Sequence, residues 1–161
     1  MNQKEVPKLT VVNYPDKILL QKSKPVVIDE EFKGWAKDFQ DLYKYLKGAL
    51  GNYMIGIASP QAGKNIRCFI ANDILYINPE IIWTTKAPLD KSGEGCLSLP
   101  MGMAWQVERP PSCSLKWQNI DGNWNKERFN GINARVIFHE IDHLDGKLCC
   151  GDDYPGKKKD E

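Results

Sequence analysis

Two histidines lie four residues apart in the run His139-Glu140-Ile141-Asp142-His143. On an α-helix, residues four apart share a face and lie one turn apart, so the two imidazoles can converge on one metal ion. The carboxylate after the first histidine is rotated by about 100°, which places it beside the metal rather than among the ligands. A carboxylate in that position can serve as general base toward a metal-bound water.

The residues around this run predict a helix that is buried on most sides. Two helical stripes are apolar apart from the histidines, one formed by Ile132, Val136, His139 and His143 and the other by Ala134, Ile137, Ile141 and Leu144. Arg135, Asp142 and Asp145 fall on the remaining face, and Gly131 and Gly146 mark the expected ends. An H-E-x-x-H run also arises by chance on surface helices. A metal site is favoured because histidines inside a buried helix need partners.

A catalytic site of this kind has three protein ligands and one open position. The chain has only two histidines, and the one glutamate after Glu140 is the terminal Glu161, so a cysteine is the best third ligand. Cys96 is favoured because Gly95 precedes it and turn-prone sequence follows, which frees the backbone to aim the thiolate. The alternatives, each also explained as a small buried hydrophobic residue, are Cys68, Cys113, Cys149 and Cys150.

The elements that position these residues are predicted from periodicity. Apolar residues at helical spacing predict a helix over 32–50, with Asp29 as its N-cap. Alternating or β-branched residues predict strands over 67–71, 74–78, 81–85, 112–118 and 124–129. The segment 54–63, considered alone, is interpreted as an ordinary loop. This mixture of strands with two helices favours an α+β fold.

The composition narrows the class of protein. A length of 161 residues with 42% hydrophobic residues fits a single catalytic domain over 1–161, with residues 155–161 as a flexible tail. The formal charge of +1 without a broad basic region argues against nucleic-acid binding. The sequence lacks a signal peptide and a membrane-length apolar run, and its five cysteines are an odd number. We expect a monomer in the cytoplasm, or in an organelle matrix or host cytoplasm if the source is not bacterial.

Three separated motifs resemble the peptide deformylases in order and spacing. They are GIASPQ at 56–61, EGCLS at 94–98 and HEIDH at 139–143, and together they are far more specific than any one alone. The resemblance spans about Val11 to Leu148. Three departures concern the substrate entrance: Met54 replaces a usual glycine, Ser59 replaces a usual alanine, and a usual arginine is absent near residues 101–103.

The resemblance implies an α+β fold in which antiparallel strands pack around a central metal-binding helix. It implies hydrolysis of the N-formyl group from nascent polypeptides that begin with formyl-methionine and emerge at the ribosome exit. The implied cofactor is one divalent metal, iron(II) in the cell, with zinc, nickel or cobalt able to replace it. The implied metal ligands are Cys96, His139 and His143.

The resemblance also assigns roles around the metal. Glu140 is the catalytic carboxylate, and Gln61 and the backbone N–H of Leu97 face the developing oxyanion. Gly56 and Ile55 lie along the bound peptide. Leu97, Ile132 and Val136 are expected to line an apolar pocket for the methionine side chain, since the two helix residues share the histidine face.

Two other functions use the same residues. A metallopeptidase that cleaves internal peptide bonds needs the same metal and glutamate. A non-catalytic metal- or peptide-binding domain is the other alternative, although Glu140 and Gln61 have no evident role in it. Release of formate from formyl-methionyl peptides, compared with cleavage of casein, separates these functions.

Overall fold

The computed structural model describes residues 5–153, so the predicted tail over 155–161 lies outside the described residues. Its regular elements are α1 (Glu30–Leu50), β1 (Gly56–Ala58), β2 (Cys68–Ala71), β3 (Ile74–Thr84), β4 (Asp90–Glu94), β5 (Trp105–Arg109), β6 (Ser112–Gln118), β7 (Trp124–Asn130) and α2 (Gly131–Leu144). Short 3-10 helices are η1 (Lys17–Leu20), η2 (Gly51–Tyr53) and η3 (Ser59–Ala62). The predicted α+β class is confirmed. Among the described residues, no helix is long and apolar enough to cross a membrane.

A five-stranded antiparallel sheet in the order β1-β2-β3-β6-β7 forms one layer of the molecule. Asn72 and Asp73 both adopt positive φ angles, 49° and 67°, which is the turn geometry that joins two strands of a tight hairpin. β3 runs unbroken where two separate strands were predicted. Asn78 has a φ of 48°, and the pairing of β3 with β6 shifts register between Ile77 and Glu80. This β-bulge accommodates Asn78 and Pro79 without ending the strand.

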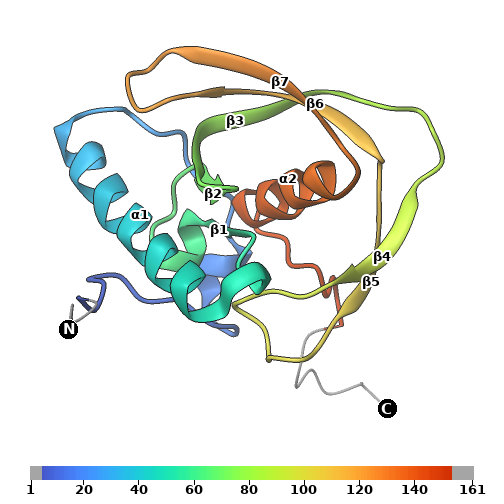
Figure 1. Cartoon of the computed structure of the whole chain (residues 1–161), viewed down its shortest axis with the longest axis horizontal. Coiled ribbons are helices and arrows are strands. Elements are labelled where there is room, and N and C mark those ends of the chain that lie inside the picture. The colour runs from blue at the N-terminus through green and yellow to red at the C-terminus, as the bar shows by residue number, and fades with distance from the viewer. Residues whose placement is uncertain (1–4, 154–161) are drawn as a thin grey trace.

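Helix α2 lies at the centre of the fold, with the sheet curving over it and the β4–β5 hairpin beside it (Figure 1). Its predicted apolar stripe is buried against apolar residues of the sheet. Ala134, Ile137, Ile141 and Leu144 join a core that contains Phe69, Tyr76, Leu115 and Phe129. The prediction of a helix buried on most sides is confirmed. This packing fixes the direction in which the two histidines point.

Helix α1 packs on β1 and β2 through a separate core. It begins at Glu30, two residues earlier than predicted, and the carboxylate of Asp29 accepts a hydrogen bond from Phe32 N at 2.8 Å. The aromatic side chains of Phe32 and Phe39 pack with Ile57 and Ile70 in this core. The helix thereby supports β1, the edge strand that passes beside the candidate site.

The structure differs from the sequence prediction in two further places. The segment 54–63 is not an ordinary loop, because it forms β1 and η3. The β4–β5 hairpin was not predicted, because β4 is exposed except at its last residue and lacks an apolar alternation. This hairpin covers the polar face of α2, where Arg135 is only 8% exposed.

Candidate metal centre

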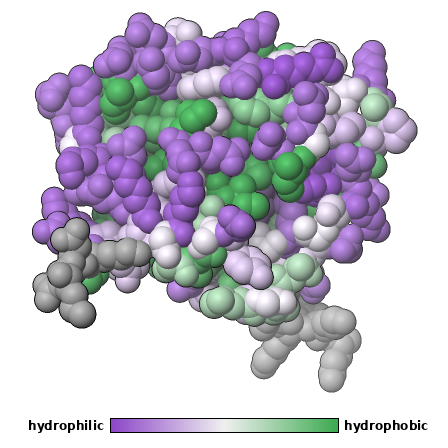
Figure 2. Space-filling model, in the orientation of Figure 1, coloured by the Kyte–Doolittle hydropathy of each residue, from purple (hydrophilic) through white to green (hydrophobic). Residues whose placement is uncertain are grey.

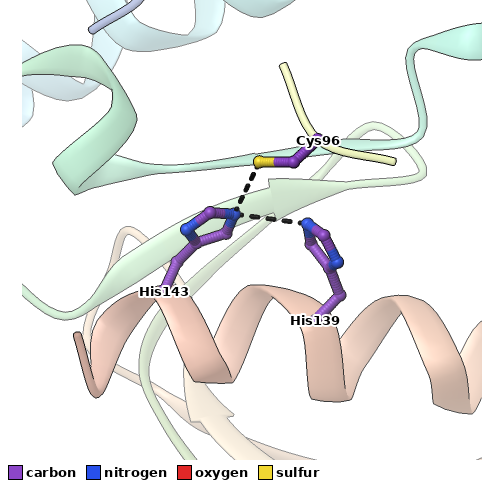
Figure 3. A group of neighbouring side chains, drawn as sticks. All are labelled: Cys96, His139 and His143. Atoms are coloured by element: carbon purple, nitrogen blue, oxygen red, sulfur yellow. Dashed lines mark hydrogen bonds between the residues drawn. The ribbon is translucent and has the colours of Figure 1, made fainter. Parts of the chain in front are cut away.

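Three side chains converge at the centre of the molecule: Cys96 from the segment after β4, and His139 and His143 from α2 (Figure 3). The Nε2 atoms of the histidines are 3.2 Å apart, and Cys96 Sγ is 3.4 Å from His143 Nε2. Tetrahedral bonds of about 2.05 Å to nitrogen and 2.3 Å to sulfur separate the donor atoms by about 3.3 and 3.5 Å. The donor set therefore fits one divalent transition metal.

The other cysteines are placed differently. Cys68 and Cys113 are buried in the cores under α1 and α2. Cys149 lies nearer the site, with its Sγ 3.8 Å from the carbonyl oxygen of Glu94, but burial raises the pKa of its thiol to about 12. Among the described cysteines, Cys96 is the one brought together with both histidines in a metal-sized group.

Cys96 is held by a tight turn whose other residues are anchored to the N-terminal segment. Leu99 N donates to the Cys96 carbonyl at 3.1 Å and closes this turn. Ser98 Oγ donates to the Val12 carbonyl at 2.6 Å, and Tyr14 N donates to the Ser98 carbonyl at 2.9 Å. Leu97 lies in this turn, directly after Cys96.

Glu94 supplies the hydrogen-bond acceptor that orients His139. Its Oε1 lies 2.9 Å from His139 Nδ1, and Arg109 holds both oxygens through Nε and Nη2 at 3.0 and 2.9 Å. Burial alone would raise the pKa of Glu94, but the hydrogen bonds from His139 and Arg109 outweigh it and hold that pKa well below its usual range. An ionised carboxylate only accepts hydrogen bonds, so Nδ1 of His139 keeps its proton with or without a metal, and Nε2 is the nitrogen that faces the other ligands.

Arg109 and the role of Glu94 were missed in the sequence. Arg109 also donates to Asp142 Oδ2 at 2.6 Å, so it links the hairpin to α2. Glu94 lies inside the EGCLS motif, two residues before the cysteine, and that proximity was an available signal. Arg109 follows in β5, an element that periodicity did not reveal.

The two histidines have opposite electrostatic surroundings. Burial lowers the pKa of His139, but hydrogen bonds with Cys96 and Glu94 outweigh it and raise that pKa to about 10. Burial and the charge of His139 lower the pKa of His143 well below its usual value, and its Nδ1 is buried without a partner among the described residues. A divalent metal would therefore displace a proton from His139 when it binds.

Glu140 is buried beside β1 rather than within the donor group. It is 3% exposed, and its Oε2 has no hydrogen-bond partner among the described residues. Burial raises its pKa to about 7; the charge of Glu94 adds to this effect and the charge of His139 opposes it. A carboxyl group with a pKa near neutrality is suited to accept and return a proton.

Gln61 directs its amide nitrogen into the site. The side chain is 2% exposed, and Oε1 accepts a hydrogen bond from Ala58 N at 2.9 Å. Because the backbone N–H needs an acceptor, Nε2 must face the other way. It lies 3.5 Å from Cys96 Sγ and 3.1 Å from Ser98 Oγ.

Of the residues expected to bind the peptide, Gly56 and Ile55 lie at the start of β1, and Val136 and Ile132 lie on α2. Gly56 begins β1 at the edge of the sheet, and the exposed Ile55 precedes it. Val136 is buried one turn before His139, and Ile132 is 63% exposed one turn earlier still. Figure 2 shows hydrophobic surface between hydrophilic borders near the middle of the face that it draws. The assignment of these residues to substrate binding stays a prediction.

Known proteins match the chain over most of its length. The family model described as polypeptide deformylase matches residues 8–158. The chain belongs to the peptide deformylase family. A peptide deformylase of Dictyoglomus thermophilum is 41% identical over 138 residues, which cover 83% of this chain and 84% of the relative. A peptide deformylase-like protein of Brucella melitensis is 36% identical over 142 residues, 84% of this chain and 82% of the relative.

Solved structures of peptide deformylases have the same fold. The crystal structure of the Thermotoga maritima peptide deformylase superposes with a TM-score of 0.77 at 30% identity, covering 87% of this chain and 93% of that chain. A Plasmodium falciparum peptide deformylase in complex with an inhibitor gives 0.76 at 31% identity, covering 92% of this chain and 90% of that one. The resemblance drawn from the three motifs is confirmed.

Proposed function

We propose that this chain is a metal-dependent hydrolase that removes the N-terminal formyl group from formyl-methionyl polypeptides and releases formate. The observation that most strongly supports this proposal is the convergence of a cysteine and two histidines beside a buried glutamate, in a chain of the peptide deformylase family. Residues 1–161 would act as one catalytic domain.

Cys96 Sγ and the Nε2 atoms of His139 and His143 would hold the ion. Iron(II) is the proposed cellular metal, and zinc, nickel and cobalt accept the same donors. A divalent metal bound there supplies Lewis acidity, which acidifies water and polarises a carbonyl group. The orientation of His139 by Glu94 keeps Nε2 available as a ligand.

Glu140 would carry the proton through the reaction. It accepts a proton from the attacking water as the water oxygen bonds to the formyl carbon, and it returns that proton to the leaving amine as the C–N bond breaks. The products are formate and a free N-terminal amine. In the metal-free chain, burial raises the pKa of Glu140 to about 7, so this carboxyl group takes up a proton more readily than an exposed glutamate does.

The developing oxyanion would be stabilised by two donors, Gln61 Nε2–H and the backbone N–H of Leu97. Gln61 is already oriented, because Ala58 N fixes its Oε1. A donor held in place before reaction costs little reorganisation when charge develops.

The substrate peptide would lie along the β1 edge, beside Gly56 and Ile55. A Cβ on Gly56 would lie 2.7 Å from Glu140 Oε1, so the glycine leaves space around the base. Leu97, Ile132 and Val136 would contact the methionine side chain. The formyl group is the smallest acyl group, so a closed site rejects acetyl by steric clash.

The physiological substrates would be nascent formyl-methionyl chains, met at the ribosome exit by a monomer. The proposed location is the cytoplasm, or an organelle matrix or host cytoplasm for a source that is not bacterial. Nucleic acid is not a proposed ligand, since the formal charge is +1.

To test this proposal, the purified, metal-loaded protein is assayed with each of three substrates. We expect formate release from a formyl-methionyl peptide, very poor hydrolysis of the acetyl-methionyl analogue and intact casein. Cleavage of casein without formate release would identify a metallopeptidase instead. Absence of turnover on all three substrates would favour a binding domain.

A further inference from the structure

Arg135 is a buried cation with no part in the proposed chemistry. It lies one turn before His139 on α2, and its side chain is 10% exposed. Nη1 donates to Glu94 Oε2 at 2.7 Å and to the Val107 carbonyl at 3.0 Å, and Nη2 donates to the Asp90 carbonyl at 2.7 Å. A single guanidinium therefore contacts both strands of the β4–β5 hairpin and the carboxylate at the end of β4.

Arg135 supplies a second guanidinium to Glu94, and this one comes from α2 instead of from the hairpin. Arg109 belongs to the hairpin, so its ion pair with Glu94 stays within the hairpin. Arg135 joins that carboxylate to α2. His139, one turn later on the same helix, contacts the other oxygen of Glu94. The helix thus holds the carboxylate at two points four residues apart.

These contacts connect the two parts of the chain that carry the donor atoms. Glu94 is two residues before Cys96, whereas both histidines are on α2. Arg135 and the Arg109–Asp142 ion pair are cross-links between hairpin and helix on opposite sides of His139. Without Arg135, Glu94 Oε2 would keep only its hydrogen bond from Arg109. The backbone carbonyls of Val107 and Asp90 would each lose the donor that Arg135 provides.

We propose that Arg135 is a positioning residue for the metal site. It fixes Glu94 against His139 Nδ1 and clamps the β4–β5 hairpin to α2, so that Cys96 and His139 keep the separation that one metal ion requires. This inference rests on the proposed metal site. Fixed hydrogen-bond partners of a ligating histidine typically contribute 10- to 100-fold to metal affinity or activity.

The test measures cobalt(II) binding by the full chain, without any turnover. Arg135→Met keeps much of the side-chain length and removes every donor, and we expect the cobalt(II) Kd to rise about 10- to 100-fold. The d–d absorption bands of the bound cobalt should also shift, because the ligand geometry relaxes. Arg135→Lys keeps the positive charge but lacks the planar guanidinium, so its cobalt(II) Kd should lie between those of the unaltered protein and Arg135→Met.

Arg67→Met is the matched control. Arg67 is a partly buried arginine at the other end of α2, where Nη1 donates to the Leu144 carbonyl and to Asp145 Oδ1, both at 3.0 Å. This variant should lose stability but keep the wild-type Kd and cobalt bands, since Arg67 does not contact Glu94. A general weakening of the fold would change both variants alike.

A folded Arg135→Met protein with the wild-type Kd and cobalt bands would overturn the positioning role. If that variant does not fold, Arg135→Lys decides, because lysine lacks the planar fork and should still raise the Kd by about threefold or more; wild-type binding by it would overturn the role. Failure of the proposed metal site would appear in the unaltered protein as absence of cobalt binding, and would overturn both proposals.

Discussion

At the scale of single residues, two neighbouring glutamates have opposite pKa shifts because their partners differ. Glu94 is held ionised by His139 and Arg109, which outweigh the effect of burial. Glu140 has no such partner at Oε2 among residues 5–153, and burial raises its pKa to about 7. When two carboxyl groups have pKa values shifted in opposite directions, one stays a fixed anion and the other can exchange protons.

The raised pKa of Glu140 predicts that it destabilises the metal-free protein at alkaline pH. Between pH 4.5 and about 7 the unfolded chain loses this proton while the folded chain keeps it, so the contribution to the free energy of unfolding falls as pH rises. Glu140→Gln should therefore be more stable than the wild type at pH 8, by on the order of 3 kcal/mol. The advantage should vanish near pH 4. Urea unfolding at both pH values measures it, and an equal difference at both would refute the assignment.

Gln61 gives a prediction about the oxyanion. Gln61→Leu removes a donor whose hydrogen bond strengthens as charge develops, so kcat should fall by about 10²- to 10³-fold with a smaller change in KM. Steady-state formate release from a formyl-methionyl peptide separates the two constants. A variant that changes KM alone would place Gln61 in ground-state binding instead.

At the scale of secondary-structure elements, predictability follows the strength of the periodic signal. Helices α1 and α2 and the β2–β3 and β6–β7 hairpins carry long apolar repeats or turn residues of known geometry, so they were predicted. Strand β1 has three residues and β4 is polar, so neither has a readable period. Tertiary contacts determine both, and these two strands carry Gly56 and Glu94.

The close approach of β1 to α2 predicts the effect of a side chain at Gly56. In Gly56→Ala the new Cβ would lie 2.7 Å from Glu140 Oε1 and 3.0 Å from the Ile70 carbonyl, which belongs to the paired strand. We expect a loss of about 1–3 kcal/mol in the free energy of unfolding, together with reduced kcat/KM because the carboxylate must move. Denaturant unfolding and formate release measure the two effects.

Gly34→Ala is the control for that substitution. Gly34 lies on the exposed face of α1, and a Cβ there would meet no atom from elsewhere in the described part of the chain within 4 Å. Alanine should stabilise this helix position by up to about 1 kcal/mol and leave activity unchanged. If both alanine variants behave alike, steric contact with Glu140 is not the cause.

At the scale of the whole molecule, the site joins parts of the chain that only the fold brings together. Cys96 comes from the segment that connects β4 and β5, and both histidines come from helix α2. The five-stranded sheet curves over this helix (Figure 1). The motifs pointed to the three residues that the fold brings together as the proposed metal donors. The sequence did not reveal the buried arginines that hold the hairpin to the helix, because isolated charged residues carry no periodic signal.

Because the donor atoms assemble only in the folded chain, metal binding should stabilise the whole molecule. At a free metal concentration of 100 times Kd, the gain is about 2.7 kcal/mol. Thermal unfolding should occur at higher temperature with nickel than after chelation. The shift should shrink at acidic pH, where protons compete for His139. An identical Tm with and without metal would contradict the site.

Metal binding and formate release by cysteine variants test whether Cys96 is the third metal ligand. Cys96→Ala and Cys149→Ala are each supplied with one nickel equivalent per chain and assayed with a formyl-methionyl peptide. Cys96→Ala should lose most of the bound metal and nearly all formate release, because a third ligand is gone. Cys149→Ala should keep both, since it removes a small side chain from outside the donor group. A Cys96→Ala protein that binds one metal per chain and releases formate at the wild-type rate would show that Cys96 is not a metal ligand.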